Sequence, residues 1–289
     1  MSVGPHAPGP ANGLSRLRPR DRRSVLNLLV PHAAQNAYIL AQISRGALGR
    51  DDLAGPLLGH WSEGLLTGVA IFGSNLVLST PCTPSARDAF ARYARAEGFR
   101  VWVVVGEDAT IDAFMATYGR QTRPTLLERP GQKLYAMHTA PDLSGQVQGL
   151  RPAEIQETEA LMRLDREMVV EELGFDPFSR DLESYRRGWK RRIREGRSWI
   201  IERHGEALFK VDQSASSEHV IQLAGVYTAP SARRQGLARE GMAGMVAWAL
   251  ERVPVVTLYV DASNHAAIRL YEALGFQEKS LVRSIWFAS

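Results

Sequence analysis

The sequence predicts an α/β protein of two similar units in tandem, each a twisted mixed sheet flanked by helices. The chain has 289 residues, enough for two ordinary domains, and 45% of them are hydrophobic. Short apolar runs alternate with stretches of helical periodicity in both halves. The opening Leu-Arg-Pro, followed by an amphipathic stretch, occurs at Leu17 and again at Leu150, which indicates an internal duplication.

The first unit is expected over residues 14–140. Residues 1–13, many of them Gly, Pro and Ala, are predicted to form a flexible tail. The helix that follows Leu17 has Asp21 or Ser24 as its candidate cap. Apolar runs predict strands at 64–72, 75–78, 101–105 and 133–138. Apolar residues at helical spacing predict helices at 84–98 and 111–118.

The second unit is expected over residues 150–289, after a linker at 141–149 that is rich in Pro, Gly, Ser and Gln. A hairpin is predicted around His204-Gly205-Glu206, between strands at 198–203 and 207–211. Further strands are predicted at 220–228, 255–260 and 284–287. After a first helix that contains Ile155 and Leu164, helices are predicted at 236–252 and 266–274.

The composition and charge make several classes of protein less plausible. The net charge is +4 and the isoelectric point about 9.4, with arginines concentrated at 16–23 and 186–197, yet no nucleic-acid motif accompanies them. Nucleic acid is therefore the least supported partner. The lone Cys82 rules out an intrachain disulfide and a multi-cysteine metal site, and we expect a loop thiol and no metal. Without a bilayer-length apolar run or a signal-peptide pattern, a cytoplasmic protein without membrane contact is predicted.

The segment richest in chemical signals covers residues 223–276. A strand ends at Thr228, a short turn follows, and the basic stretch 233–239 leads directly into a helix. The first amides of a helix have no internal partners and lie at the positive end of the helix dipole. Gly236 allows a ligand to approach the backbone closely, and the arginines add charge. This arrangement predicts an anion site that suits a pyrophosphate.

Two spaced motifs lie in this segment. Arg233-x-x-Gly236-x-Ala238 follows one strand, and Asn264-x-x-Ala267-x-x-x-Tyr271-x-x-x-Gly275-Phe276 follows the next. Together they resemble the pyrophosphate loop and the second signature of the GNAT superfamily of acyl-CoA-dependent N-acyltransferases. The whole chain is also similar to two-part bacterial proteins in which a degenerate GNAT-like region precedes an intact GNAT domain, so the resemblance implies tandem GNAT-like folds.

The resemblance implies an N-acetyltransferase that uses acetyl-CoA as co-substrate, with direct attack of an amine on the thioester. It assigns cofactor binding to strand and loop groups and to one side chain of the second motif: Val226, Tyr227, Thr228, Arg233, Arg234, Gln235, Gly236, Leu237, Ala238, Arg239 and Asn264. An amide near Val226 or Tyr227 is expected to polarise the thioester carbonyl. Tyr271 is expected to give a proton to the leaving thiolate, because the pKa of a phenol lies near or above that of a thiol.

The general base that deprotonates the amine is less well defined. Glu171 and Glu172 lie at the end of the first helix of the second unit, a region that borders the acceptor pocket in the family, and they are the catalytic candidates. Glu218, His219 and Gln222 precede the cofactor loop and are further candidates, although Gln222 can only orient a water.

The first unit departs from the family pattern. Its counterpart of the cofactor loop, residues 78–87, has no Gly and two prolines, each of which removes an amide donor. It is predicted to bind no acetyl-CoA and to be structural, or to wall off part of the acceptor site. The acceptor is expected to be a small-molecule or protein amine, and the chain a monomer or homodimer. Two alternatives are a non-catalytic acyl-CoA sensor or interaction module, and a transferase that uses another activated donor such as aminoacyl-tRNA.

Overall fold

The structure is a computed structural model that describes residues 12–53, 55–99, 101–119, 124–140, 149–174, 176 and 181–288. The predicted tail falls mostly on residues 1–11 and the predicted linker mostly on residues 141–148, and both stretches lie outside the described residues. The strands are β1 (Gly13–Arg16), β2 (Leu57–Ser62), β3 (Leu65–Phe72), β4 (Asn75–Leu78), β5 (Val103–Glu107), β6 (Thr125–Met137), β7 (Leu150–Pro152), β8 (Ser198–Arg203), β9 (Glu206–Ser216), β10 (Ile221–Thr228), β11 (Val256–Val260) and β12 (Gln277–Phe287).

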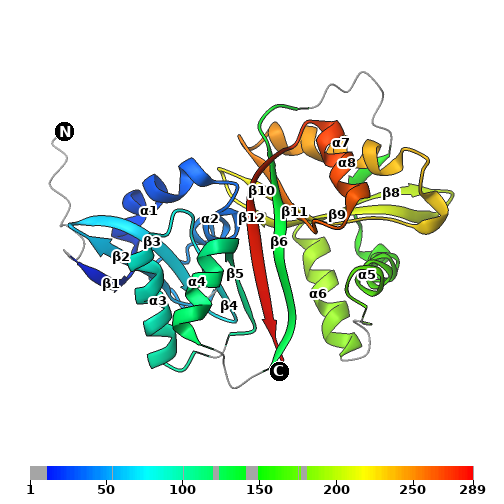
Figure 1. Ribbon diagram of the computed structural model, residues 1–289. Helices are drawn as coiled ribbons and strands as arrows, with labels where there is room; N and C mark the ends of the chain where they lie inside the picture. The colour runs from blue at the N-terminus through cyan, green and yellow to red at the C-terminus, as the bar shows by residue number, and fades with distance from the viewer. Residues whose placement is uncertain are drawn as a thin grey trace.

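The helices cover both faces of the sheet, as the sequence predicts for a mixed α/β fold (Figure 1). They are α1 (Arg22–Leu29), α2 (Ala37–Ser44), α3 (Pro84–Ala96), α4 (Asp108–Tyr118), α5 (Thr158–Leu173), α6 (Leu182–Arg194), α7 (Leu237–Leu250) and α8 (His265–Leu274). In the first half, α1 and α2 pack on one face and α3 and α4 on the other. In the second half, α5 and α6 pack on one face and α7 and α8 on the other. The predicted fold class is confirmed.

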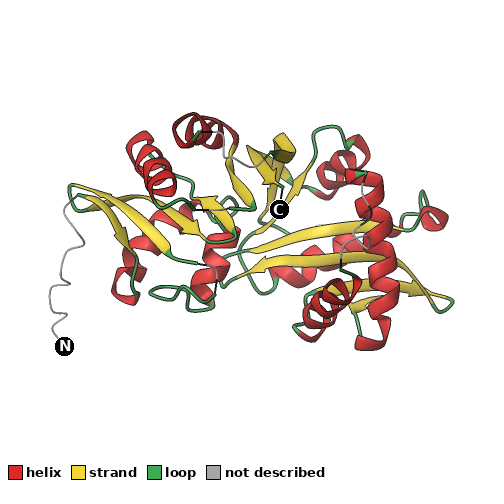
Figure 2. Ribbon diagram, turned by 90° about the horizontal axis from the view of Figure 1, so that it is seen from below, coloured by secondary structure: helices red, strands yellow, loops and turns green. Residues whose placement is uncertain are grey.

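The strands of both halves form one continuous sheet in the order β1-β2-β3-β4-β5-β12-β6-β11-β10-β9-β8-β7. The last strand, β12, pairs with β5 of the first half, with Ile285 opposite Val104. Conversely, β6 precedes residue 141 and yet pairs with β11, with Tyr135 opposite Leu258. The two halves therefore exchange a strand, and β6 and β12 lie side by side between them (Figures 1 and 2).

The predicted elements are present with modest shifts at their ends. The strand expected at 133–138 is the end of the long β6, and the strand expected at 284–287 is the end of β12. The sequence reading missed α2, α6 and β2. Residues Ala37–Ile43 of α2 are buried almost without interruption, because this helix packs on its own half and also on β9 and β10 of the other half. Its sequence is therefore apolar all round and lacks the amphipathic period.

Candidate functional site

Two neighbouring parallel strands separate at the centre of the second half. Pairing between β10 and β11 covers Ile221 to Leu223 on one strand and Val256 to Leu258 on the other. Beyond Leu223 and Leu258 the strands continue without pairing to each other. The backbone groups that follow Leu223, on the side of β10 that faces β11, are therefore available to a ligand. Such a ligand would lie between the two strands and pair with them as an additional strand does.

A bulge in β10 lies where this separation begins. The register between β10 and β9 shifts between Ala224 and Tyr227, and Gly225 has a left-handed backbone with φ +59°. A Cβ atom at Gly225 would lie 2.5 Å from Asp212 Oδ2 and 2.8 Å from Lys210 Nζ. Only glycine fits this backbone and this contact.

A buried ionic cluster lies directly beside the bulge at Gly225. Lys210 is completely buried, and its ammonium group donates to Asp165 Oδ1 at 2.9 Å and to Asp212 Oδ2 at 3.0 Å. These two carboxylates raise the pKa of Lys210 even though burial acts in the opposite direction. Ser198 donates to Asp212 at 2.6 Å and Tyr185 donates to Asp165, so the carboxylates have partners on several elements. Sequence reasoning missed this cluster, and the one signal for it is a lysine inside the apolar run Phe209-Lys210-Val211.

The loop between β10 and α7 has the backbone of an anion-binding concavity. After a short 3₁₀ turn at Pro230–Ala232, Arg234 has φ +61° and Gly236 has φ +81°. Left-handed residues alternating with right-handed or extended ones turn successive amides toward one point. The first intrahelical bond of α7 is donated by Glu240 to Gly236 O at 3.0 Å, so the amides of Leu237 to Arg239 precede the helical ladder.

The arginines of this loop divide into two kinds. Arg233 is engaged within the protein, because its guanidinium donates to Glu171 at 3.0 and 2.6 Å and to Thr228 O at 3.2 Å. Arg234 and Arg239 are exposed, and no ion pair to another described residue occupies them. Arg233 thus fixes the loop to α5, while Arg234 and Arg239 are available to an anion.

A cavity of about 620 Å³ extends from the separated strands to the end of α5. Of the residues predicted from the sequence, Val226, Asn264, Tyr271, Glu171 and Glu172 line it. The loop residues 233–239 and the residues Tyr227 and Thr228 lie outside its lining. Three residues of the first half, Val105, Arg129 and Gln132, complete the wall, so both halves form this cavity.

Glu171 and Glu172 are adjacent but have opposite electrostatic environments. The Arg233 guanidinium holds the pKa of Glu171 below its usual value, and the Tyr227 hydroxyl also donates to Glu171, at 3.2 Å. Desolvation by the surrounding protein atoms raises the pKa of Glu172, although the positive charges of Arg129 and Lys210 partly oppose this effect. Glu172 is accessible from the cavity and is the better base of the two, whereas Glu171 acts as the anchor of the loop.

Tyr271 lies in the same cavity and holds its proton firmly. It is 5% exposed, and its ring packs against Phe276 and Tyr135 at centroid distances of 5.8 and 6.5 Å. Burial, and to a lesser degree the charge of Glu172, raise the pKa of Tyr271 above its usual value. At neutral pH this phenol is a proton donor.

The remaining candidates have structural partners. The Asn264 carbonyl oxygen accepts from Ala267 N at 3.1 Å and caps α8, while the residue also lines the cavity. Glu218 and His219 precede β10 at the end opposite to the separated strands and do not line the cavity, but Gln222 does. Burial raises the pKa of Cys82 to about 12, so its thiol stays protonated at neutral pH.

The described residues show neither a metal-binding cluster nor a membrane-spanning helix. They contain no group of three or more His, Cys, Asp or Glu side chains arranged to hold a metal ion. Within the same residues, the helices are too short or too polar to cross a bilayer.

Comparisons with known proteins identify the second half. None of the curated proteins compared matches the sequence. Solved structures that cover nearly the whole chain include a Drosophila protein (14% identity, 96% of this chain and 99% of the other, TM-score 0.61). A GCN5-related N-acetyltransferase from Sphaerobacter thermophilus has 16% identity, 96% coverage of each chain and a TM-score of 0.56. A GNAT-family acetyltransferase from Colwellia psychrerythraea has 13% identity, with 95% of this chain and 99% of the other covered and a TM-score of 0.54.

These structural matches, at such low identity, establish a shared fold over both halves. The sequence itself matches the family model described as "Acetyltransferase (GNAT) family" over residues 159–276, the stretch that holds both motifs and the separated strands. The chain therefore contains, at residues 159–276, a domain of the acetyltransferase (GNAT) family.

Proposed function

We propose that the chain is an acyl-CoA-dependent N-acyltransferase that transfers acetyl from acetyl-CoA to a primary amine. The observation that carries the proposal is the end of β10–β11 pairing at Leu223 and Leu258, directly beside a cavity that holds both an acid and a base. A strand-like ligand arm fits between the separated strands. Its anionic end fits the loop that leads into α7.

The residues present suit CoA in two respects. A Cβ at Gly236 would meet no atom within 4 Å, so the space above the loop is open, and the left-handed backbone there favours glycine. The exposed Arg234 and Arg239 supply the positive charge that a pyrophosphate requires. Acetyl-CoA would supply the activated acetyl group as a thioester.

The protein's own groups then have distinct tasks. The Val226 amide, on the part of β10 that does not pair with β11, donates to the developing oxyanion. Glu172 takes the proton of the attacking amine, and its raised pKa makes it a stronger base than an ordinary carboxylate. Tyr271 gives its proton to the departing sulfur. The Arg233–Glu171 pair and the Lys210 cluster hold the loop and the bulge in position.

The proposal is tested by separating binding from turnover. CoA binding is measured by calorimetry and acetyl transfer by thiol release with a panel of amines, for the wild type and Tyr271→Phe. We expect Tyr271→Phe to bind CoA as the wild type does and to lose about 100-fold or more in turnover, the usual contribution of a general acid. Tyr93→Phe, a packed tyrosine outside the cavity, is the matched control.

Two results would contradict the proposal. Absence of CoA binding to the wild type would remove the cofactor assignment. CoA binding without thiol release from any amine, in both wild type and variant, would favour a non-catalytic acyl-CoA sensor.

A further inference from the structure

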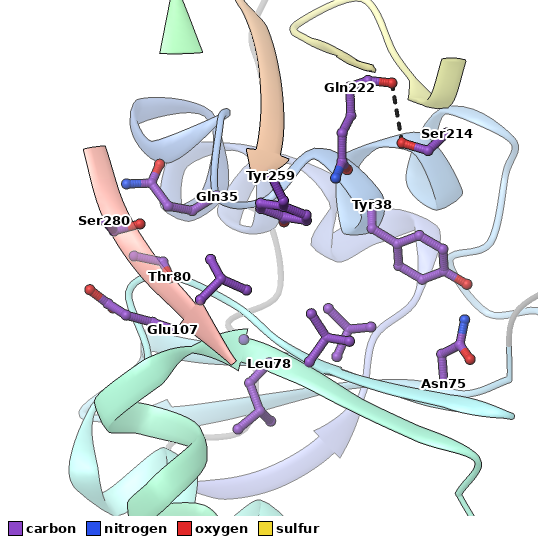
Figure 3. A pocket seen from close by; sticks show the side chains of 14 residues that line it. Gln35, Tyr38, Asn75, Leu78, Thr80, Glu107, Ser214, Gln222, Tyr259 and Ser280 are labelled. Atoms are coloured by element: carbon purple, nitrogen blue, oxygen red, sulfur yellow. Dashed lines mark hydrogen bonds between the residues drawn. The ribbon is translucent and has the colours of Figure 1, made fainter. Parts of the chain in front are cut away.

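A second, smaller cavity of about 170 Å³ lies between the two halves (Figure 3). Its walls come from the segment that leads into α2, from β4 and β5 of the first half, and from β9, β10, β11 and β12. The lining residues that matter here are Val77, Val105, Glu107, Gln222, Tyr259 and Val282. The proposed function uses none of its polar side chains.

This cavity adjoins the cavity of the proposed acyl-transfer site. Val105, Gln222, Tyr259 and Val282 line both. Gln222 and Tyr259 lie on β10 and β11, the two strands that separate one residue after Gln222. A molecule in the smaller cavity is therefore next to the separated strands, on the face of the sheet that α2 covers and not on the face that α7 covers.

The lining has one charged group, Glu107. No Lys, Arg or His belongs to the lining, which includes the apolar side chains of Val77, Val105 and Val282. Strand alternation directs Glu107 to the same face of β5 as Val105, whereas Gly106 faces Ile111 of α4. Glu107 is half-buried, and in the described part of the chain its carboxylate has neither an ion pair nor a hydrogen bond.

A partly exposed carboxylate that has no partner within the described chain is available to pair with a cationic group of a ligand. In Figure 3, Glu107 lies near Thr80 and Ser280, and Tyr259 separates it from Gln222. The lining thus has a negative group at Glu107, apolar side chains, and neutral polar groups at Gln222 and Tyr259 on the strands of the proposed transfer site, with Glu107 and Gln222 on opposite sides of Tyr259.

The volume of the smaller cavity indicates the size of a molecule that it holds by itself. A protein cavity of about 150 Å³ accommodates benzene, which has about six non-hydrogen atoms. A cavity of about 170 Å³ therefore takes a molecule of a similar number of atoms. An unbranched chain of four carbons with a nitrogen at each end meets this limit and matches the polarity of both ends.

We propose that this cavity is the acceptor subsite and that its substrate class is the short aliphatic diamine. The inference rests on the proposed transferase function. The distal ammonium group pairs with Glu107, the methylene chain contacts the three valines, and the other nitrogen, uncharged, lies at Gln222 and Tyr259 where the acetyl group is delivered. Glu107 is a specificity determinant and takes no part in proton transfer.

The test compares 1,4-diaminobutane with butylamine, which has the same carbon chain and lacks the distal amine. Binding to the full chain is measured by calorimetry with and without CoA, and turnover by thiol release. A charge-assisted contact predicts a preference of about tenfold or more for the diamine, in binding and in kcat/KM. In Glu107→Gln we expect this preference to fall about tenfold, mainly through KM, while Glu97→Gln, an exposed carboxylate on the same half, retains it.

The outcomes separate the two proposals, and the wild-type comparison requires no variant to fold. Equal binding of the two amines to the wild type, or a preference that survives Glu107→Gln, overturns the diamine subsite. Thiol release with butylamine but no diamine preference overturns the subsite and leaves the transferase in place. A Glu107-dependent diamine preference in binding, with no thiol release from any amine, supports a diamine-binding site and overturns both the transferase and the role of the cavity as its acceptor subsite.

Discussion

Replacement of Gly225 by alanine tests how tightly β10 is tied to the buried ionic cluster of Lys210, Asp165 and Asp212. The left-handed backbone at φ +59° costs an L-residue about 1–2 kcal/mol. The new Cβ would lie 2.5 Å from Asp212 Oδ2, so the carboxylate must move away from Lys210. Because complete loss of one partner of a buried pair costs about 3–5 kcal/mol, we assign about 2 kcal/mol to this partial displacement.

The two contributions together predict a loss of about 3–4 kcal/mol in the free energy of unfolding. For a chain of this size each kcal/mol lowers the midpoint of thermal unfolding by about 2 °C, so Gly225→Ala should unfold about 6–8 °C below the wild type. Differential scanning calorimetry of the ligand-free protein measures this shift. Acetyl transfer should also fall, because the Val226 amide follows the bulge directly.

Two matched glycine variants separate strain from collision. Gly236 has φ +81° and open space around its Cβ position, so Gly236→Ala carries backbone strain alone and should lower the midpoint by about 2–4 °C. Gly188, within α6, has an ordinary φ and open space, so Gly188→Ala should leave the midpoint unchanged or raise it. If Gly225→Ala and Gly236→Ala have equal midpoints, the contact with Asp212 carries no energy and the reasoning fails.

Three further variants examine neighbouring groups. Lys210→Met removes the ion-pair partner of the partly buried Asp165 and leaves the buried Asp212 with Arg192 alone, at 3.6 Å, so it should cost about 3 kcal/mol in urea unfolding, whereas the exposed Lys279→Met should cost less than about 0.5; a similar small loss for both would contradict a structural role for the cluster. Glu172 has a raised pKa in the folded state, so its contribution to stability is present at low pH and is lost as the pH rises through that pKa. Glu172→Gln should therefore stabilise the protein more at pH 8 than at pH 4, and the opposite order of unfolding midpoints would reject the assignment. Arg234→Ala should weaken CoA binding several-fold, with a smaller salt dependence, while leaving stability within about 0.5 kcal/mol; unchanged affinity would exclude Arg234 from the anion site.

Local signals in the sequence predicted most elements of the second half, with the exception of α6. The motif from Asn264 to Phe276 contains an N-terminal cap, apolar residues at helical spacing and a C-terminal glycine. As these signals predict, α8 is capped by Asn264 and ends before Gly275. The turn from β10 into α7 also follows from local chemistry, because Gly236 is needed for its left-handed backbone. These features depend on residues within a few positions of one another.

The strand exchange could not be predicted in this way. The apolar runs Val103-Val104 and Leu134-Tyr135-Ala136 are buried on both faces, and such runs do not specify which strand lies beside them. The partner of β5 comes from the end of the second half, and the partner of β11 comes from the first. Pairing between the halves depends on the overall packing, which cannot be predicted from the pattern of residues within one strand.

The residues of the candidate site fall into the same two classes: those that local sequence patterns predicted and those that only the structure revealed. Tyr271 and the loop residues belong to compact motifs, and the cavity residues among them were predicted from the sequence. The Lys210 cluster was not, because Asp165 is 45 residues away from Lys210 and lies on a different element. The distinction between Glu171 and Glu172 also required the structure, since Arg233, which lowers the pKa of Glu171, is 62 residues distant from it.

The exchange of β6 and β12 has a consequence for synthesis on the ribosome. While the first half is being made, β5 has no neighbour on its outer side, because the strand that covers it is residues 277–287. An open edge of this kind invites pairing with other chains. The sheet can close only after nearly all of the described chain has been translated, so a nascent polypeptide of this protein should depend on chaperones for longer than two independent domains of the same size would.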